Sequence, residues 1–241
     1  MDLQTECDLG RFMEEKRYKI LAGCAILAII LLLPLWGECQ EGVDHILNGI
    51  HNRYGGVGGL VINYRREVKT KTMSMLGGRV KGDLASGKIY LLPPNLLRVE
   101  QEKPRPETVL ADGQALWWII PEEKKVYQYS SDQFGQELRV LTDLWQAPSR
   151  LKNRFNIKVL SRPSDNDFLM ELIPNPPWEQ VDRIRLQITK KFTPQALDII
   201  NPIGTTTRFY FDAIKPAHCL SEKNFQFVVP EGYTVIHDPS Q

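Results

Sequence analysis

Apolar and polar residues alternate along most of the chain, in short runs separated by Gly, Pro and Asp-Gly turns. In the clearest run Ile184, Leu186 and Ile188 are separated by Arg and Gln. Side chains two residues apart in a β-strand point to the same side, so this strand has an apolar face and a polar face. Phe209 and Phe211 repeat the pattern. The alternation predicts a wide antiparallel sheet with one apolar face.

Turn signals divide this region into a meander of expected strands. Asp112-Gly113 is typical of a hairpin turn, and the segment from Pro121 to Lys124 predicts a second turn. The expected strands are 60–67, 69–76, 79–85, 87–92, 96–102, 107–111, 115–120, 124–130, 155–161, 167–173, 181–190, 195–201, 204–213 and 225–229.

Two segments have helical spacing instead. Residues 43–54 place Ile46, Leu47 and Ile50 on one side, and a glycine-rich stretch follows them. Residues 134–153 place Leu138, Leu141, Leu144 and Trp145 on one helical face. A sheet of this width must cover its apolar face or use it to hold something apolar. Because so few helices are available, we expect a curved sheet with a helical lid over a cavity.

Composition and charge exclude several classes of function. With 42% apolar and 24% charged residues, the chain can form a buried core. Its 30 basic and 29 acidic residues give no general electrostatic case for binding nucleic acid. The four cysteines form no metal-binding pair and are too sparse for a disulfide framework. We therefore expect no metal and no cofactor.

The sequence also lacks the usual signs of a catalytic site. No histidines have zinc-binding spacing, and no Gly-x-Ser-x-Gly motif for a lipid hydrolase is present. Asp165, Asp167 and Glu171 lie around an expected hairpin, where solvation accounts for them better than acid–base chemistry does. We expect no catalytic residues and no enzyme.

The N-terminal region resembles an export signal. Residues 20–36 (ILAGCAILAIILLLPLW) carry no charge and follow Lys16, Arg17 and Lys19. Pro34 and Gly37 stand where a cleavage region belongs. We expect residues 1–39 to be a signal peptide, with an uncut membrane anchor as the alternative, and residues 40–241 to form one domain. Because the first twelve residues are unlike a signal's basic start, translation from Met13 is a further hypothesis.

The motifs of residues 40–241, taken in their order along the chain, resemble those of the periplasmic outer-membrane lipoprotein carriers, the LolA-like proteins. The resemblance covers residues 43–241: a first helix, then 87–98 (GKIYLLPPNLLR), 109–121 (VLADGQALWWIIP) and 225–236 (FQFVVPEGYTVI). It implies a mainly β fold, an unclosed antiparallel β-barrel covered by helices over an apolar cavity. It also implies a carrier that shields the acyl chains of lipoproteins and moves them from the inner to the outer membrane.

The resemblance suggests which residues face the cargo. The expected lipid-binding residues are Leu97, Val99, Leu116, Trp118, Ile120, Ile184, Leu186, Ile188, Phe209 and Phe211. The expected lid residues are Ile46, Leu47, Ile50, Leu138, Leu141 and Leu144. Ordinary core packing is the competing interpretation of each.

Partners and location follow from the same resemblance. The expected partners are acylated lipoproteins or lipids, an inner-membrane lipoprotein-releasing transporter and an outer-membrane lipoprotein receptor, with no nucleic acid. We expect a monomer in the periplasm of a Gram-negative bacterium; inner-membrane anchoring facing the periplasm is the alternative.

One position departs from the family. Many members carry an arginine, thought to clasp the lid, immediately before the motif proline; here that position is Pro93, which has no side-chain donor. Because its loss can signal different cargo, two other functions stay open. They are a carrier of free lipid or glycolipid, and a lipid-sensing regulatory module anchored to the inner membrane.

Overall fold

The computed structural model describes residues 38–75, 82–160 and 167–237, excluding the side chains of 38–41, 74 and 131–138. Cys39–Gln241 groups into one compact unit. The predicted signal or anchor, which falls almost wholly on residues 1–37, therefore lies outside the described residues and stays a prediction.

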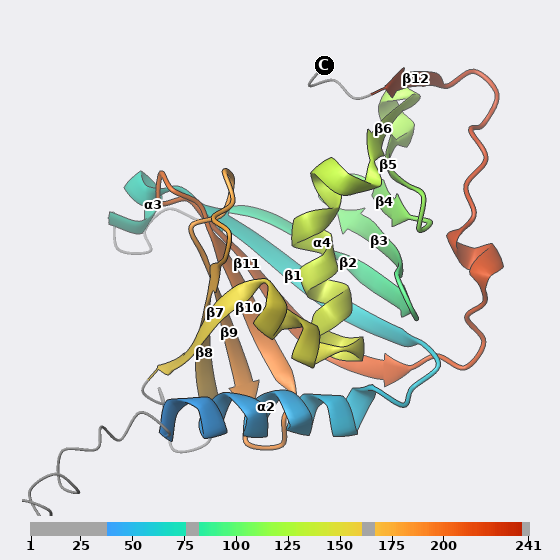
Figure 1. The fold of residues 1–241 in the computed structure, drawn as a ribbon. Helices are drawn as coiled ribbons and strands as arrows, with labels where there is room; N and C mark the ends of the chain where they lie inside the picture. The colour runs from blue at the N-terminus through green and yellow to red at the C-terminus, as the bar shows by residue number, and fades with distance from the viewer. Residues whose placement is uncertain (1–37, 76–81, 161–166, 238–241) are drawn as a thin grey trace, which may run out of the picture. The chain divides into compact units, whose positions relative to one another are not determined.

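Within the described part of the chain, twelve strands form a single sheet (Figure 1). They are β1 (Leu60–Lys69), β2 (Asp83–Leu92), β3 (Leu96–Lys103), β4 (Glu107–Ala111), β5 (Ala115–Ile120), β6 (Lys125–Ser130), β7 (Phe155–Leu160), β8 (Asp167–Pro174), β9 (Arg183–Thr189), β10 (Pro194–Ile200), β11 (Thr206–Pro216) and β12 (Thr234–His237). Their order is β12-β6-β5-β4-β3-β2-β1-β11-β10-β9-β8-β7. All neighbours are antiparallel except β12, which is parallel to β6. Because β7 and β12 are separate edges, the sheet is open, and the predicted mainly β, unclosed barrel is confirmed.

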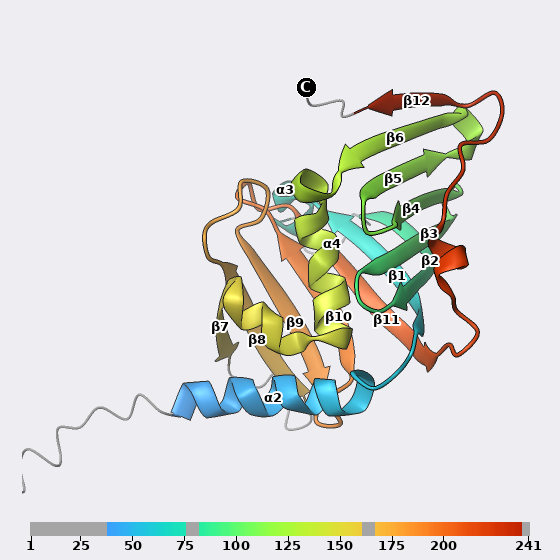
Figure 2. The ribbon, with the colours of Figure 1, turned by 45° about the vertical axis from the view of Figure 1, so that its right-hand side comes forward.

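Few helices accompany this sheet. In the described residues the α-helices are α2 (Glu38–Tyr54), α3 (Lys71–Met75) and α4 (Ser131–Gln146), and the 3-10 helices are η1 (Pro121–Glu123), η2 (Pro148–Asn153) and η3 (Glu222–Phe225). In Figure 2, α2 crosses one end of the strands β8 to β10, and α4 stands in front of the sheet. Within the described part of the chain, no helix is both long and apolar enough to span a membrane.

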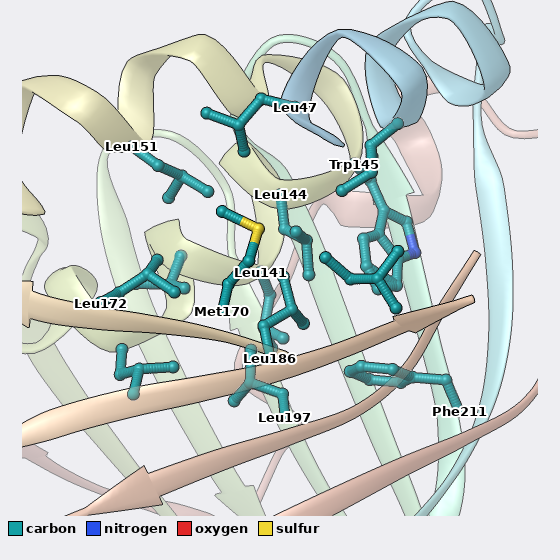
Figure 3. Close-up of a cluster of buried hydrophobic side chains, with 14 of the residues drawn as sticks. Leu47, Leu141, Leu144, Trp145, Leu151, Met170, Leu172, Leu186, Leu197 and Phe211 are labelled. Carbon is teal, nitrogen blue, oxygen red and sulfur yellow. The ribbon is translucent and has the colours of Figure 1, made fainter. Parts of the chain in front are cut away.

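A continuous hydrophobic core joins α2, α4 and η2 to the sheet. In Figure 3, Leu47 of α2, Leu144 of α4 and Leu151 of η2 approach Met170 and Leu186. All five side chains are buried. The two predicted helical segments form the layer of this core that packs on the sheet. The sequence pattern therefore places their apolar faces correctly.

Four predicted strands differ from the structure. The expected strand 69–76 is wrong, because β1 ends at Lys69 and the hydroxyl of Thr70 accepts a hydrogen bond from the Met73 backbone N–H (3.3 Å), which starts α3. The expected division between strands 79–85 and 87–92 is also wrong, because β2 (Asp83–Leu92) continues from residue 85 through Gly87 without a break; residues 79–81 lie outside the described residues. A Cβ at Gly87 would lie 1.9 Å from the Glu100 carbonyl oxygen, so this glycine permits close strand approach.

The expected strand 225–229 is also absent. Ser221 and Asn224 form a reciprocal capping box that starts η3, and Phe225 is buried to 1% exposure at its end. The ring of Phe227 contacts that of Trp117, with 5.4 Å between centroids. The alternating phenylalanines therefore arise from packing against the sheet, while the pairing strand is β12, which the pattern did not predict.

Candidate functional site: an apolar face and two cavities beside α4

All ten side chains predicted to bind lipid lie on one face of the sheet. Residues opposite each other in neighbouring strands share a face, as do residues two apart in one strand. The opposed pairs are Leu186–Leu197–Phe209 in β9 to β11, Tyr64–Phe211 in β1 and β11, Ile62–Ile89–Val99 in β1 to β3, and Val99–Val109–Trp118 in β3 to β5. The chain thus builds one extended apolar surface, and we call this the inner face.

Five of the ten residues lie in the packed core. Ile184, Leu186 and Ile188 of β9 and Leu97 of β3 are at most 1% exposed, and Phe211 of β11 is also buried. They belong to the same cluster as the buried residues of α2 and α4. In this arrangement they contact protein, and their predicted contact with cargo stays a prediction.

The predicted lid residues are buried where their side chains are described. Ile46, Leu47 and Ile50 face the core from α2, and Leu141 and Leu144 face it from α4. The side chain of Leu138 lies outside those described.

Trp145 is a further contact of α4 that the predicted lid set lacks. Its ring stacks on Tyr54 of α2 (6.1 Å between centroids) and meets Phe211 of β11 edge-on (5.0 Å). The side chain is 1% exposed. Its position one turn after Leu141 was the sequence signal for this contact, because residues four apart lie on one helical face. Trp145 thus connects α4 to both α2 and the sheet.

A cavity of about 500 Å³ lies beside α4, at the end of the sheet where β3, β4 and β5 begin or end. Its lining residues are Asn95, Leu97, Ala111, Gly113, Ala115, Leu116, Arg139, Thr142, Asp143, Arg150, Asn153 and Arg154. Two predicted lipid-binding residues, Leu97 and Leu116, are buried in this lining. The sheet supplies a largely apolar wall, whereas α4, η2 and Arg154 supply the charged groups. We call it the arginine cavity.

Among the described residues that line the arginine cavity, Asp143 is the single acidic one. Its carboxylate accepts a hydrogen bond from Arg154, and Arg150 Nη1 lies 4.0 Å away. Burial raises the pKa of Asp143 above its ordinary value, although Arg154 and Arg150 act to lower it. These contacts join α4 to η2. Pro93, which replaces the family's clasp arginine, is exposed in the turn between β2 and β3.

A second cavity of about 320 Å³ lies by Leu141 of α4, toward β10 and β11. Its lining residues are Arg66, Leu141, Gln180, Ile199, Asn201, Thr205, Thr207 and Phe209. Phe209, another predicted lipid-binding residue, is therefore at a cavity wall. Within the described part of the chain, the buried Nε of Arg66 has no hydrogen-bond partner. Leu141 and Thr142 are adjacent on α4, so the helix contributes to both cavities.

The remaining predicted residues extend the inner face beyond the arginine cavity. Val99 and Trp118 are half-buried and Ile120 is buried. Trp118 stacks on Tyr127 (5.2 Å between centroids), and its indole N–H donates to Glu107 (3.0 Å). The indole thus has a satisfied polar end and a partly accessible apolar body.

Trp117 lies on the opposite face, since neighbouring residues of a strand point to opposite sides. Its indole N–H donates to Asp112 at the start of the β4–β5 turn (2.9 Å). Burial raises the pKa of Asp112, but hydrogen bonds from Ala115, Trp117 and Gln114 outweigh it and leave that pKa below its ordinary value. Gly113 has φ of +89°, so the predicted Asp-Gly hairpin turn is confirmed.

The carboxylates weighed for acid–base chemistry have structural partners. Glu171 accepts a hydrogen bond from Arg185 (3.1 Å), and Asp167 accepts one from Gln187 (2.9 Å). Asp165 lies outside the described residues. In the described part of the chain, no group of three or more His, Cys, Asp and Glu residues has an arrangement that could hold a metal ion.

Comparisons with known proteins agree with this geometry. The family model "Outer membrane lipoprotein carrier protein LolA" matches residues 77–228. An outer-membrane lipoprotein carrier protein of Xanthomonas campestris pv. campestris (strain B100) is 24% identical over 163 residues, covering 67% of this chain and 76% of that protein. Its counterpart in Neisseria meningitidis serogroup B (strain ATCC BAA-335 / MC58) is 23% identical over 212 residues, covering 87% and 94%.

A solved structure supports the fold. An uncharacterized conserved protein from Thermus thermophilus superposes with a TM-score of 0.51 at 11% identity, covering 81% of this chain and 99% of that chain.

Proposed function

Because the chain belongs to the LolA family of outer-membrane lipoprotein carrier proteins, we propose that it shields the acyl chains of lipoproteins on its inner face and moves them from the inner to the outer membrane. One observation carries the proposal: ten predicted lipid-binding side chains share one face of an unclosed sheet, and part of that face lies beside cavities. The half-buried part of this face, at Val99 and Trp118, offers an apolar surface that apolar cargo can cover.

In this proposal α4 is the movable part of the lid. The arginine cavity and the second cavity lie beside the same helix, so displacement of α4 would join them into one groove. A cavity of about 500 Å³ suits a ligand of drug size. Cargo with several acyl chains therefore requires α4 to move, while α2 stays packed on β8 to β10.

The strength of acyl burial explains why a partial cover is useful. Burial of an acyl chain is worth roughly 0.8 kcal/mol per CH2, so three fully buried chains of about sixteen carbons would total on the order of 40 kcal/mol. A carrier that recovered all of this could not release its cargo. An open sheet with a displaceable helix recovers only part of it, which allows transfer to a tighter receptor.

The cellular setting of the proposal follows the family. The chain receives lipoproteins from an inner-membrane releasing transporter, crosses the periplasm of a Gram-negative bacterium as a monomer, and delivers them to an outer-membrane receptor. The N-terminal segment directs export. The work is binding and release, so we propose no catalytic step.

The proposal is tested by isolating the full chain from the envelope of its native host and recording its native mass spectrum. We expect a bound tri-acylated lipoprotein. A bound free lipid would instead support the free-lipid alternative. If the chain is recovered only in the inner membrane with residues 20–36 intact, a tethered receptor or sensor replaces the shuttle.

Two valines provide a matched pair of variants for this experiment. Val99 and Val61 are both half-buried in the sheet, and the strand alternation and opposed pairs place them on opposite faces. Val99→Asp puts a charge on the inner face and is expected to abolish recovery of cargo. Val61→Asp puts the same charge on the outer face and is expected to retain it. Equal loss in both variants, with unchanged thermal melting, would contradict cargo binding on the inner face.

A further inference from the structure

We propose that the second cavity binds the polar head of a lipid, with Arg66 as the main hydrogen-bond donor, while the attached acyl chain lies on the inner face. The head is an ester, a carboxylate or a phosphate, whose shared chemistry is oxygen atoms that accept hydrogen bonds. The inference deepens the proposed function and rests on it, because the acyl chain is taken to lie where the carrier holds its cargo.

Two neighbouring arginines of β1 have opposite surroundings. Arg65 points to the outer face, where it makes a bidentate pair with Asp212 (2.7 and 2.8 Å). Arg66 points to the inner face, since it lies two residues after the buried Tyr64 and opposite Phe209. The Nε of Arg66 is buried, and among the residues that the structure describes it has no hydrogen-bond partner. Arg66 is therefore an inner-face donor with bonding capacity left over.

The unpaired Nε of Arg66 requires a structural reason. Most buried polar side-chain atoms in proteins have a partner, because an unpaired one loses the hydrogen bonds that it would make in water. Arg66 lines the second cavity, whose volume is about 320 Å³. This volume leaves room for a small polar group beside the guanidinium. An acceptor oxygen of a ligand in this cavity would complete the hydrogen bonding of Arg66.

The other polar residues of the lining also favour a ligand that accepts hydrogen bonds. The side-chain oxygen of Asn201 accepts a bond from the Thr205 backbone N–H (2.7 Å), which leaves the NH2 group of Asn201 as a donor. The hydroxyls of Thr205 and Thr207 can donate as well, and Gln180 adds a second amide. A head with several oxygens would thus meet donors from β1, from the β10–β11 turn and from β11.

The apolar part of the lining indicates where the acyl chain begins. Its residues are Leu141, Ile199 and Phe209. On β2, the neighbouring strand, the inner-face residue opposite Arg66 is Ala85, and Gly87 follows on the same face. Small residues therefore lie between the second cavity and Val99 of β3. In the proposal, the acyl chain leaves the cavity along this path when α4 is displaced.

The test compares ligands that have chains of one length and differ in the head. The full chain is freed of lipid and titrated with dodecyl phosphate, laurate, methyl laurate and dodecyltrimethylammonium below their micellar concentrations, with displacement of an apolar fluorescent probe as the readout. The first three heads have acceptor oxygens, and the fourth has none. We expect the two anionic ligands to bind most tightly, because hydrogen bonds between charged partners are the stronger ones, and the fourth ligand to bind most weakly. The phosphate, carboxylate and ester arms distinguish a phospholipid, a fatty acid and the acyl esters of a lipoprotein as the source.

Two variants remove donors from the cavity. Arg66→Met keeps a long apolar side chain and removes every donor of the guanidinium. We expect it to weaken dodecyl phosphate and laurate about tenfold, which corresponds to one hydrogen bond to a charged group, and not to weaken dodecyltrimethylammonium. Thr207→Val removes one hydroxyl at nearly constant shape and should weaken the same two ligands about threefold.

Arg65→Met is the matched control, because it makes the same change at the adjacent position on the outer face. The pair between Arg65 and Asp212 is exposed, with side chains 60% and 41% accessible. Exposed ion pairs contribute little to stability. The control variant is therefore expected to fold normally and to keep the affinities of the wild type for all four ligands.

Thermal melting of the ligand-free protein is a second readout. Arg66→Met removes a buried donor that has no partner, so we expect the melting temperature to rise by about 2 °C. An arginine that only supported the fold would instead lower the melting temperature when it is removed. A gain in stability together with a loss of affinity therefore identifies a binding residue.

The outcomes separate this site from the proposed function. Equal affinities of all four ligands, unchanged in Arg66→Met and Thr207→Val, would show that the cavity holds water only; this would overturn the head site and leave the apolar carrier standing. Failure of all four ligands to displace the probe would overturn both. An equal loss of affinity in Arg65→Met would show general charge attraction and overturn the assignment to the cavity. If Arg66→Met does not fold, the contrast between Thr207→Val and Arg65→Met decides.

Discussion

The two halves of the sheet differ in how their inner faces are covered. In the closed half, formed by β1 and β7 to β11, Leu186 and Met170 are at most 1% exposed beneath α2, α4 and η2. In the open half, formed by β3 to β6, Val99 and Trp118 are only half-buried, and the arginine cavity lies between the strands and α4. The same apolar alternation therefore produces a packed core around Leu186 and Met170 in one half and a partly accessible surface at Val99 and Trp118 in the other.

Contacts between the covering elements maintain this difference. Lys152 of η2 pairs with Asp44 of α2 (2.7 Å), and the ring of Phe192 lies against Gly49 of α2. The open half is instead supported from its outer face, where Phe227 contacts Trp117 and Arg98 donates to the Asn224 carbonyl (3.2 Å). The closed half is thus built for stability, and the open half keeps its shape with its inner face partly free.

The largest expected difference between the two halves is in the free energy of unfolding that is lost when a side chain is truncated. Leu186→Ala removes a fully packed side chain and should lower the free energy of unfolding by about 2–5 kcal/mol. Val99→Ala should cost less than about 1 kcal/mol, because its site is already partly open. Urea denaturation of both variants measures the contrast, and equal costs would mean that the two halves are packed alike.

Enlarging a side chain should show the same contrast between the two halves, with a smaller effect on the free energy of unfolding. A Cβ at Gly49 would lie 2.3 Å from the Phe192 ring. Gly49→Ala should therefore destabilise the protein by about 1–3 kcal/mol, although alanine normally favours a helix. Ala111→Leu extends into the arginine cavity and should change stability by less than about 0.5 kcal/mol while weakening probe binding. A stable Gly49→Ala, or an Ala111→Leu variant that unfolds, would contradict the assignment of packed and open regions.

The smallest effect concerns the β4–β5 hairpin of the open half. Asp112→Ala removes the acceptor of the turn and should cost roughly 1 kcal/mol. Because the folded pKa of Asp112 is below its ordinary value of 3.8, its contribution is present above that pH and is lost as the pH falls through the lower folded pKa. Unfolding measured between pH 2 and pH 6 should show the wild type and the variant converging at the acid end. A constant gap would contradict the hydrogen-bonded carboxylate.

Local patterns were sufficient to predict most of the fold. The alternation of Ile184, Leu186 and Ile188 identified the correct strand and face, and helical spacing placed Ile50 and Leu144 in the core. Local sequence failed where a distant contact decides the structure. The pattern ended one strand at residue 85 and began another at Gly87, yet β2 is continuous there and Gly87 allows it to approach the Glu100 carbonyl.

The site was less predictable than the fold. Alternation cannot distinguish a residue under a helix from one beside a cavity, so Leu186 and Leu116 looked equivalent. The arginine cavity depends on the meeting of α4, η2 and β3 to β5, and no single stretch of sequence contains that arrangement. From the sequence alone, nothing distinguishes Arg139, Arg150 and Arg154 from ordinary surface residues. Only the structure shows that they line one cavity.

The central claim, that cargo lies on the inner face of the open half, is tested most directly by photo-crosslinking. A benzophenone amino acid is placed at Trp118 in the open half or at Trp178, which packs against Phe155 of the closed half. An acylated lipoprotein is loaded and the sample is irradiated. We expect a cross-link to the acyl chains from position 118 and none from position 178. Cross-linking from position 178 alone, or from neither position while cargo remains bound, would contradict the account.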